Sequence, residues 1–162
     1  MIAATEDALT ELLVQRLHAR VTSAMIVDWA TDALRNGEDT PSLAILAGLD
    51  RTSSVYETMP WLDKALSELN VVPPPPAELR RAFVAVVSRA LMAGRITSEQ
   101  ALDRIHEDVV TPLGHPADLM AWCYVWEGLG PTDFRELTPA DVDVEARKLA
   151  AAWARHAGLF TA

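Results

Sequence analysis

Apolar residues recur along the chain at intervals of three and four, the spacing of one face of an α-helix. In the first half, three such stripes are formed by Leu9, Leu12, Leu13 and Leu17, by Met25, Ile26, Trp29, Ala33 and Leu34, and by Val55, Met59, Leu62, Leu66 and Leu69. Pro60 lies inside the third stripe, so we expect it to shorten or bend that helix. The first half is therefore predicted to be helical.

The second half continues the same periodicity. Its stripes are Leu79, Phe83, Val86, Val87, Ala90 and Leu91, then Ala101, Leu102, Ile105 and Val109, and finally Val142, Ala146, Leu149, Ala150, Trp153 and Ala157. Residues 119–126 are apolar nearly all round, as is typical of a helix at the centre of a protein or at an interface. No alternating apolar run indicates a strand. We predict an all-α fold, a compact bundle of about seven or eight helices in one domain.

Capping residues stand where these helices should begin and end. Capping boxes, in which Ser or Thr is followed three residues later by Glu or Gln, occur at 54–57 and 97–100. Thr138 and Pro139 predict a further N-cap and first helical position. Thr5 is a predicted N-cap of the first helix, and Gly94 and Gly158 are predicted helix ends.

The stretch NGEDTPSLAILAGL, residues 36–49, has the composition of a joint between helices. Gly37 suits the left-handed position that ends a helix. Asp39 or Thr40 would then cap a new helix that has Pro41 at its first position and Gly48 at its end. Every turn-forming residue in the stretch thus has a structural role.

The segment VVPPPP at residues 71–76 is the one break in composition. Consecutive prolines favour an extended polyproline conformation, which makes a stiff spacer. We therefore interpret residues 1–162 as a single helical domain in which a Pro-rich spacer at 73–76 separates two sub-bundles.

Composition bears on the cellular compartment of the protein and on the class of partner that it binds. Cys123 is the single cysteine, so no disulfide framework exists within the chain, which fits a reducing compartment. No segment is apolar and long enough to predict a membrane span, and the acidic N-terminus differs from a secretory signal. We therefore expect a cytoplasmic protein. The formal net charge of −9 disfavours binding to nucleic acid and to anionic membranes. It would speed encounter with a basic partner, or it serves solubility alone, so charge by itself does not identify a partner.

Candidate catalytic and metal-binding residues are few. The segment beginning His106–Glu107 resembles the start of an HExxH zinc motif, but Val110 stands where the second histidine belongs. His18, His115 and His156 show no ligand spacing, and a pairing of Cys123 with His106 or His115 is a minor alternative. We therefore expect no catalytic residues, no cofactor and no metal site, with a small helical enzyme as the third-ranked function.

A helix-turn-helix is the second-ranked interpretation. Residues 41–60 have the rhythm of bacterial repressor motifs, and Thr52, Ser53, Ser54 and Tyr56 would then open the helix that reads the major groove. Arg51 is the one basic residue nearby, beside Asp50 and Glu57, and phosphate contacts need basic residues. Charge therefore counts against a DNA-binding regulator.

Residues 29–49 resemble a motif of small bacterial all-helical proteins, LxxGxD(S/T)xxLxxLAGL. The matching residues are Leu34, Gly37, Asp39, Thr40, Leu43, Leu46, Ala47, Gly48 and Leu49. The resemblance covers roughly an eighth of the chain. It implies an accessory or immunity-type protein of bacterial conflict systems, and it implies no particular activity.

These observations favour a non-enzymatic, cytoplasmic protein-interaction module, of immunity or antitoxin-like type, that binds a basic partner. Core packing accounts for most of the five tryptophans, while exposed ones would serve as anchors for another protein. The candidate protein-binding residues are Trp61, Tyr56 and Asp39. The sequence does not indicate whether the chain forms a homo-oligomer.

Overall fold

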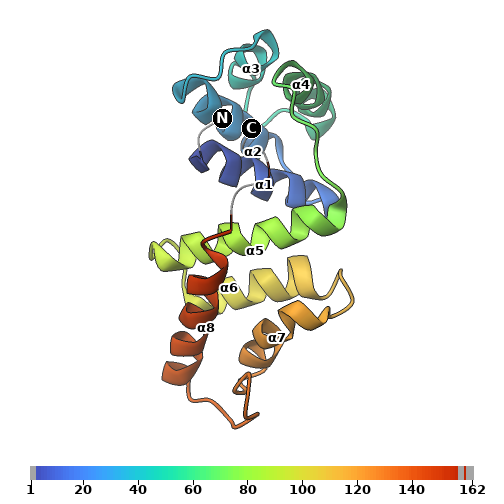
Figure 1. Cartoon of the computed structure of the whole chain (residues 1–162). Coiled ribbons are helices and arrows are strands. Elements are labelled where there is room, and N and C mark those ends of the chain that lie inside the picture. Colours follow the sequence, from blue (N-terminus) through green and yellow to red (C-terminus); the bar gives the residue numbers. More distant parts are fainter. Residues whose placement is uncertain (1–2, 157–158, 160–162) are drawn as a thin grey trace. The chain divides into compact units, whose positions relative to one another are not determined.

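The computed structural model describes residues 3–156 and 159, and within them the fold is all-α, as predicted (Figure 1). The chain divides into two compact units, and among the described residues unit 1 holds 3–79 with residue 159, and unit 2 holds 80–156. The division falls within α5, shortly after the Pro-rich segment. Each unit is described by itself below.

Unit 1 is built from four helices. They are α1 (Ala3–Leu17), α2 (Ser23–Arg35), α3 (Pro41–Ala47) and α4 (Val55–Glu68). α2 packs against the other three, and α3 also packs against α4. The largest buried side chains come from the predicted stripes and from α3: Leu9, Leu12, Ile26, Leu43, Leu46 and Leu62. Removal of these apolar surfaces from water is the main force that holds unit 1 together.

Unit 2 contains most of α5 and the elements that follow it up to residue 156. Its elements are α5 (Pro76–Met92), α6 (Ser98–Ile105), the π-helix η1 (His106–Val110), the 3-10 helix η2 (Ala117–Leu119), α7 (Met120–Trp126) and α8 (Pro139–Trp153). α6, α7 and α8 pack against one another, and η1 packs against α6 and α7. Phe83, Leu91, Ile105, Leu119 and Trp122 are its largest buried side chains.

The predicted caps are confirmed at four helix starts. Thr40, Ser54, Thr97 and Thr138 each occupy the N-cap, and their side-chain oxygens accept hydrogen bonds from backbone N–H groups of the first turn. Capping boxes are complete at 54–57 and 97–100, and Asp141 completes a third with Thr138. The helix boundaries thus follow from side-chain chemistry that is visible in the sequence.

Gly37 ends α2 in a left-handed conformation, as predicted. Its φ is +90°, its N–H donates to the carbonyl of Leu34, and the N–H of Glu38 donates to the carbonyl of Ala33. These two bonds form a Schellman motif, which satisfies carbonyls that the helix leaves unpaired. Gly94 ends α5 in the same way, at a φ of +69°. The predicted end at Gly158 lies outside the described residues.

One local prediction is wrong, and a second is wrong in part. α1 begins at Ala3, so Thr5 is an internal residue rather than the N-cap, and its hydroxyl accepts a hydrogen bond from the side chain of Asn36 at 2.8 Å. α4 runs without a break from Val55 to Glu68, so Pro60 does not shorten it. Pro60 lies in the second turn of α4, and the bend expected there stays a prediction.

A carboxylate from α4 holds the first turn of α3. Glu68 accepts hydrogen bonds from the backbone N–H of Ser42 at 3.0 Å and from its hydroxyl at 2.7 Å. Negative charge at a helix N-terminus is stabilising because the backbone N–H groups there point outward. These bonds hold the pKa of Glu68 below its ordinary value, with the backbone bond of Ser42 as the largest cause.

Within the described residues, no helix combines the length and the apolar character that crossing a membrane requires.

Replacement of Gly37 by Ala should lower the free energy of unfolding by about 1 kcal/mol, because a Cβ strains the left-handed conformation. The cost is conformational, since a Cβ there would meet nothing within 4 Å. Gly48→Ala is the matched control, because Gly48 ends α3 at a φ of −88°, which any residue adopts. Denaturant unfolding should show a loss for Gly37→Ala alone. Equal effects of the two variants would contradict the account.

Replacement of Glu68 by Gln should lower stability at neutral pH and have little effect in acid. The folded-state pKa of Glu68 is depressed, so its stabilisation is present above its ordinary pKa of 4.5 and disappears as pH falls through the lower folded value. Free energies of unfolding of both proteins should therefore converge below that range. Glu136→Gln, an exposed carboxylate of unit 2, is the control. A gap between wild type and Glu68→Gln that persists in acid would contradict this role.

Candidate functional site

The three predicted protein-binding residues all lie in unit 1. Tyr56 is in the first turn of α4 and is 87% exposed, Asp39 is exposed just before α3, and Trp61 is half-buried further along α4. Tyr56 and Trp61 do not share a helix face, because five residues of α-helix correspond to a net rotation of about 140°. Tyr56 is therefore the more accessible anchor of the two.

Trp61 is partly covered by its own helix. The ammonium nitrogen of Lys64 lies 5.2 Å from the centre of the indole ring, a cation–π contact. The other four tryptophans differ in exposure: Trp29 and Trp122 are buried, Trp153 is half-buried and Trp126 is 42% exposed. Core packing thus explains two of the five tryptophans completely.

The residues proposed for a helix-turn-helix form α3 and α4 with a seven-residue connection, 48–54, between them. Such motifs usually have a turn of three or four residues. Arg51, the one basic residue near the proposed recognition helix, forms an ion pair with Asp28 at 2.9 Å. Thr52 donates both its backbone N–H and its hydroxyl to Asp50. These contacts stabilise the connection and leave little positive charge for phosphate.

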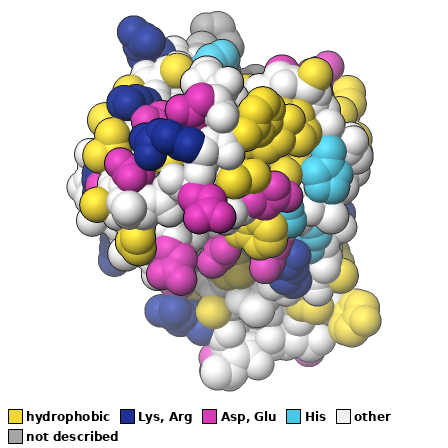
Figure 2. Space-filling model, turned by 90° about the horizontal axis from the view of Figure 1, so that it is seen from below, with side chains coloured by type: hydrophobic (Ala, Val, Ile, Leu, Met, Phe, Trp, Pro, Cys, Tyr) yellow, Lys and Arg dark blue, Asp and Glu magenta, His cyan; other side chains and the backbone are white. Residues whose placement is uncertain are grey.

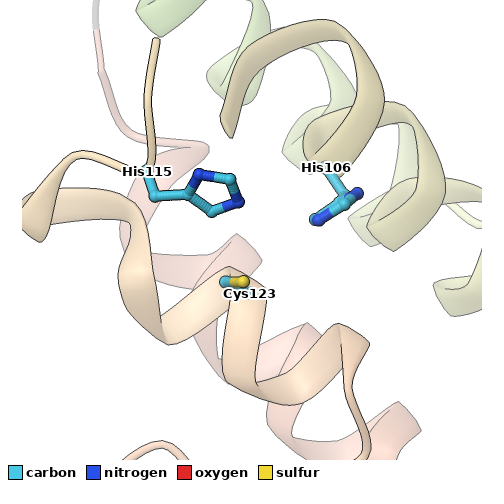
Figure 3. A group of neighbouring side chains, drawn as sticks. All are labelled: His106, His115 and Cys123. Carbon is cyan, nitrogen blue, oxygen red and sulfur yellow. The ribbon is translucent and has the colours of Figure 1, made fainter. Parts of the chain in front are cut away.

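In unit 2, the structure brings together three side chains that are far apart in the sequence. The ligand atoms of His106, His115 and Cys123 all lie within 4.8 Å of one another. Figure 3 shows the two imidazole rings pointing toward a shared space, with the thiol on the third side. We call these three residues the His–His–Cys cluster. It is the one group of three or more His, Cys, Asp or Glu donors with metal-site spacing among the described residues.

His106 is positioned by a change of helix type. α6 passes directly into the π-helix η1, and the carbonyl of His106 accepts a hydrogen bond from the N–H of Thr111, five residues later, at 3.0 Å. A π-turn adds one residue to the helical turn and shifts the following side chains around the axis. Single π-turns of this kind are frequent at functional sites.

His115 is positioned by two successive left-handed residues. Gly114 has a φ of +72° and His115 a φ of +57°, and the N–H of His115 donates to the carbonyl of Val110 at 3.0 Å. This reversal folds the chain back toward the end of η1, so that the ring centres of His115 and His106 are 6.1 Å apart. Histidine is among the residues that tolerate a positive φ.

Cys123 completes the cluster from the middle of α7. The residue is buried, and its thiol donates a long hydrogen bond, 3.9 Å, to Oε1 of Glu127. Burial raises the pKa of the Cys123 thiol, and the negative charge of Glu127 raises it further. A raised pKa keeps the thiol protonated, so Cys123 is not poised as a nucleophile.

An exposed aromatic side chain supports the cluster. The indole of Trp126 stacks on the ring of His106, with ring centres 3.8 Å apart and planes within 2°. Its Nε1–H donates to Asp103 of α6 at 2.9 Å. Figure 2 shows histidine side chains beside hydrophobic and acidic ones on one face of the molecule. The orientation of the His106 ring is therefore determined by its neighbours.

Comparison with protein-family models, with curated proteins and with solved structures finds no match to this chain.

The sequence suggests a pairing of Cys123 with His106 or His115 only as a minor alternative, because the spacing of the three residues matches no metal motif. His106 and His115 are separated by eight residues, and Cys123 follows after seven more. The pair Gly114–His115 is the signal that was available, since it indicates a chain reversal, but the π-turn has no clear sequence signature. Sequence spacing therefore gives no ligand pattern for His106 and His115, although the structure brings the two side chains together.

Cys123 should react slowly with a neutral alkylating reagent in the folded protein, kept free of metal by a chelator, and quickly after unfolding. Glu127→Gln should raise the native rate several-fold, because removal of the carboxylate charge lowers the pKa of the thiol. Glu107→Gln, a nearby exposed carboxylate, is the control. Reaction followed by mass spectrometry gives the rates. Equal rates in folded and unfolded protein would show that Cys123 is not protected.

Proposed function

We propose that the chain is a non-enzymatic protein-interaction module whose unit 1 binds a basic protein. The observation that carries the proposal is the exposure of Tyr56, 87%, on the more acidic of the two units. A large exposed aromatic on a unit with a surplus of negative charge is the combination expected of a docking surface, where aromatics supply affinity and charge supplies steering.

The charge of the chain is concentrated in unit 1. Residues 1–79 contain 12 of the 23 acidic residues but only 5 of the 14 Lys and Arg residues, so their formal charge is −7 of the total −9. Charge that served solubility alone would have no reason to be concentrated in one half. This asymmetry supports a partner whose surface is basic.

Three of the five basic residues of unit 1 form ion pairs with carboxylates of the same unit. Arg16 pairs with Asp63, Arg35 pairs with Asp32 within α2, and Arg51 pairs with Asp28. Such exposed pairs add little to stability, but each confines a positive charge close to a negative one. The surplus carboxylates, exposed Asp39 among them, then determine the field that a partner meets.

The biological role within this proposal is that of a cytoplasmic immunity or antitoxin-like protein, which covers a basic partner rather than acting on it. The resemblance of residues 29–49 to small bacterial helical proteins supports this role, and Gly37 and Thr40 of that motif organise the joint before α3. A basic protein is favoured over DNA because the connection 48–54 contains one basic residue, Arg51, which already forms an ion pair with Asp28.

Tyr56→Ala should strongly reduce capture of a basic partner from a bacterial lysate without changing the melting temperature, because the side chain makes little contact with its own fold. A loss of at least tenfold in affinity is expected for a central aromatic anchor. Trp61→Ala should also weaken capture, with a small loss of stability because the ring is half-buried. Phe134→Ala, which removes an aromatic that is 57% exposed in unit 2, is the matched control.

Association with the isolated partner should slow as salt rises, because the Debye length shrinks from about 30 Å at 0.01 M to about 8 Å at 0.15 M. Asp39→Asn should reduce the association rate and leave dissociation nearly unchanged. Acidic partners, or rates independent of salt, would exclude charge complementarity. Saturable binding to duplex DNA would instead favour the regulator hypothesis for residues 41–60.

A further inference from the structure

We propose that the His–His–Cys cluster of unit 2 is a binding site for one divalent transition-metal ion, with Zn²⁺ as the ion that the donor set favours. The proposal concerns His106, His115 and Cys123 alone. It goes beyond the protein-binding role of unit 1 and does not depend on it.

The donor set identifies the class of metal. Two imidazoles and one thiolate are ligands of Zn²⁺ and of related borderline or soft ions. Ca²⁺ and Mg²⁺ require oxygen ligands, which this cluster does not supply. Zn²⁺ has no redox chemistry of its own, and it is commonly bound in tetrahedral sites of mixed nitrogen and sulfur donors.

The spacing is close to that of a metal site. In tetrahedral zinc sites, with bonds of about 2.0 Å to nitrogen and about 2.3 Å to sulfur, neighbouring donor atoms are about 3.3 to 3.8 Å apart. The donors of the cluster lie within 4.8 Å of one another, so they need to approach by roughly 1 Å. His115 is exposed, so its side chain is the donor least restrained by core packing.

The donors come from three elements and converge (Figure 3). His106 belongs to η1, His115 to the turn that follows it, and Cys123 to α7. In the part of the chain that the structure describes, no hydrogen bond engages either imidazole ring, and the Cys123 thiol has only its long contact with Glu127. The nitrogen atoms are therefore available for coordination.

The surroundings orient one ligand and attract a cation. Trp126 stacks on His106 and is itself held by Asp103, which restrains the ring much as outer-shell partners do in metal sites. Glu127 adds a negative charge 3.9 Å from the sulfur. Metal binding replaces the S–H bond of Cys123 by a metal–sulfur bond and releases the proton to solvent.

A fourth coordination position is left open. Three protein ligands on a tetrahedral ion leave one position for water or for a further donor, and His115 is exposed, so solvent reaches the cluster. Glu127 lies 3.9 Å from the sulfur but does not belong to the group of three donors, so we expect water at the open position.

The test begins with the whole chain, freed of metal by a chelator and titrated with Zn²⁺ by calorimetry and chelator competition. We expect one equivalent to bind with a Kd of roughly 1 µM or tighter. Co²⁺ is the spectroscopic probe: a bound Co²⁺ should show the visible bands of a tetrahedral ion and a near-ultraviolet band of thiolate-to-metal charge transfer. Absence of saturable binding near one equivalent would overturn the proposal.

Three variants locate the ion. His115→Asn removes an exposed ligand while retaining a residue that tolerates a positive φ, so it should fold normally. It should weaken Zn²⁺ binding more than about 100-fold, since loss of an outer-shell partner alone costs 10- to 100-fold. Cys123→Ser should abolish the charge-transfer band. His156→Asn, which alters an exposed histidine of unit 2 outside the cluster, should bind as wild type.

Circular dichroism of each variant confirms that it is folded before its affinity is interpreted. Unchanged Zn²⁺ affinity in His115→Asn overturns the proposal even if Cys123→Ser fails to fold. A Co²⁺ spectrum without the thiolate band, or equal losses in His115→Asn and His156→Asn, overturns it as well. Slower alkylation of Cys123 on addition of Zn²⁺ in wild type, but not in His115→Asn, supports it independently.

Discussion

The fold depends on how the backbone groups at the ends of its helices are satisfied. The helices are short, from 7 residues in α3 and α7 to 17 in α5, so a large share of the backbone lies in first and last turns. Such N–H and C=O groups lack intrahelical partners and are costly to bury unpaired. Ser and Thr hydroxyls accept hydrogen bonds from such N–H groups at five described helix starts, and Glu68 of α4 does so at the start of α3. Each cap determines where a helix starts and how the chain turns.

The same constraint creates the cluster in unit 2. η1 ends with hydrogen bonds from the turn that carries Gly114 and His115 back to Val110 and Thr111. That turn reverses the chain and delivers one imidazole beside another, and α7 then supplies the thiol from a third direction. Unit 1 uses its helix ends for a different purpose. Its joint before α3 and the capped start of α4 place Asp39 and Tyr56 on the surface.

Much of the fold could be predicted because its signals are local. Stripes of apolar residues locate the helices, and Gly37, Thr40 and the two capping boxes locate their ends. Errors arose where packing overrides local chemistry, since Thr5 is drawn into α1 and bonded by Asn36, and Pro60 is tolerated inside α4. The sequence indicates a pairing of Cys123 with a histidine only as a minor alternative. The cluster of three depends on a π-turn and on the packing of α7 against η1, which the spacing of the residues does not encode.

In the proposed metal site of unit 2, the ends of the helices bring the three ligands together. X-ray absorption at the zinc edge of the loaded protein tests it most directly, because it counts the atoms around the ion. We expect one sulfur at about 2.3 Å from the zinc ion and two imidazole nitrogens at about 2.0 to 2.1 Å, with one further light atom. A shell of oxygen and nitrogen without sulfur would contradict it, since Zn²⁺ would then lie away from Cys123.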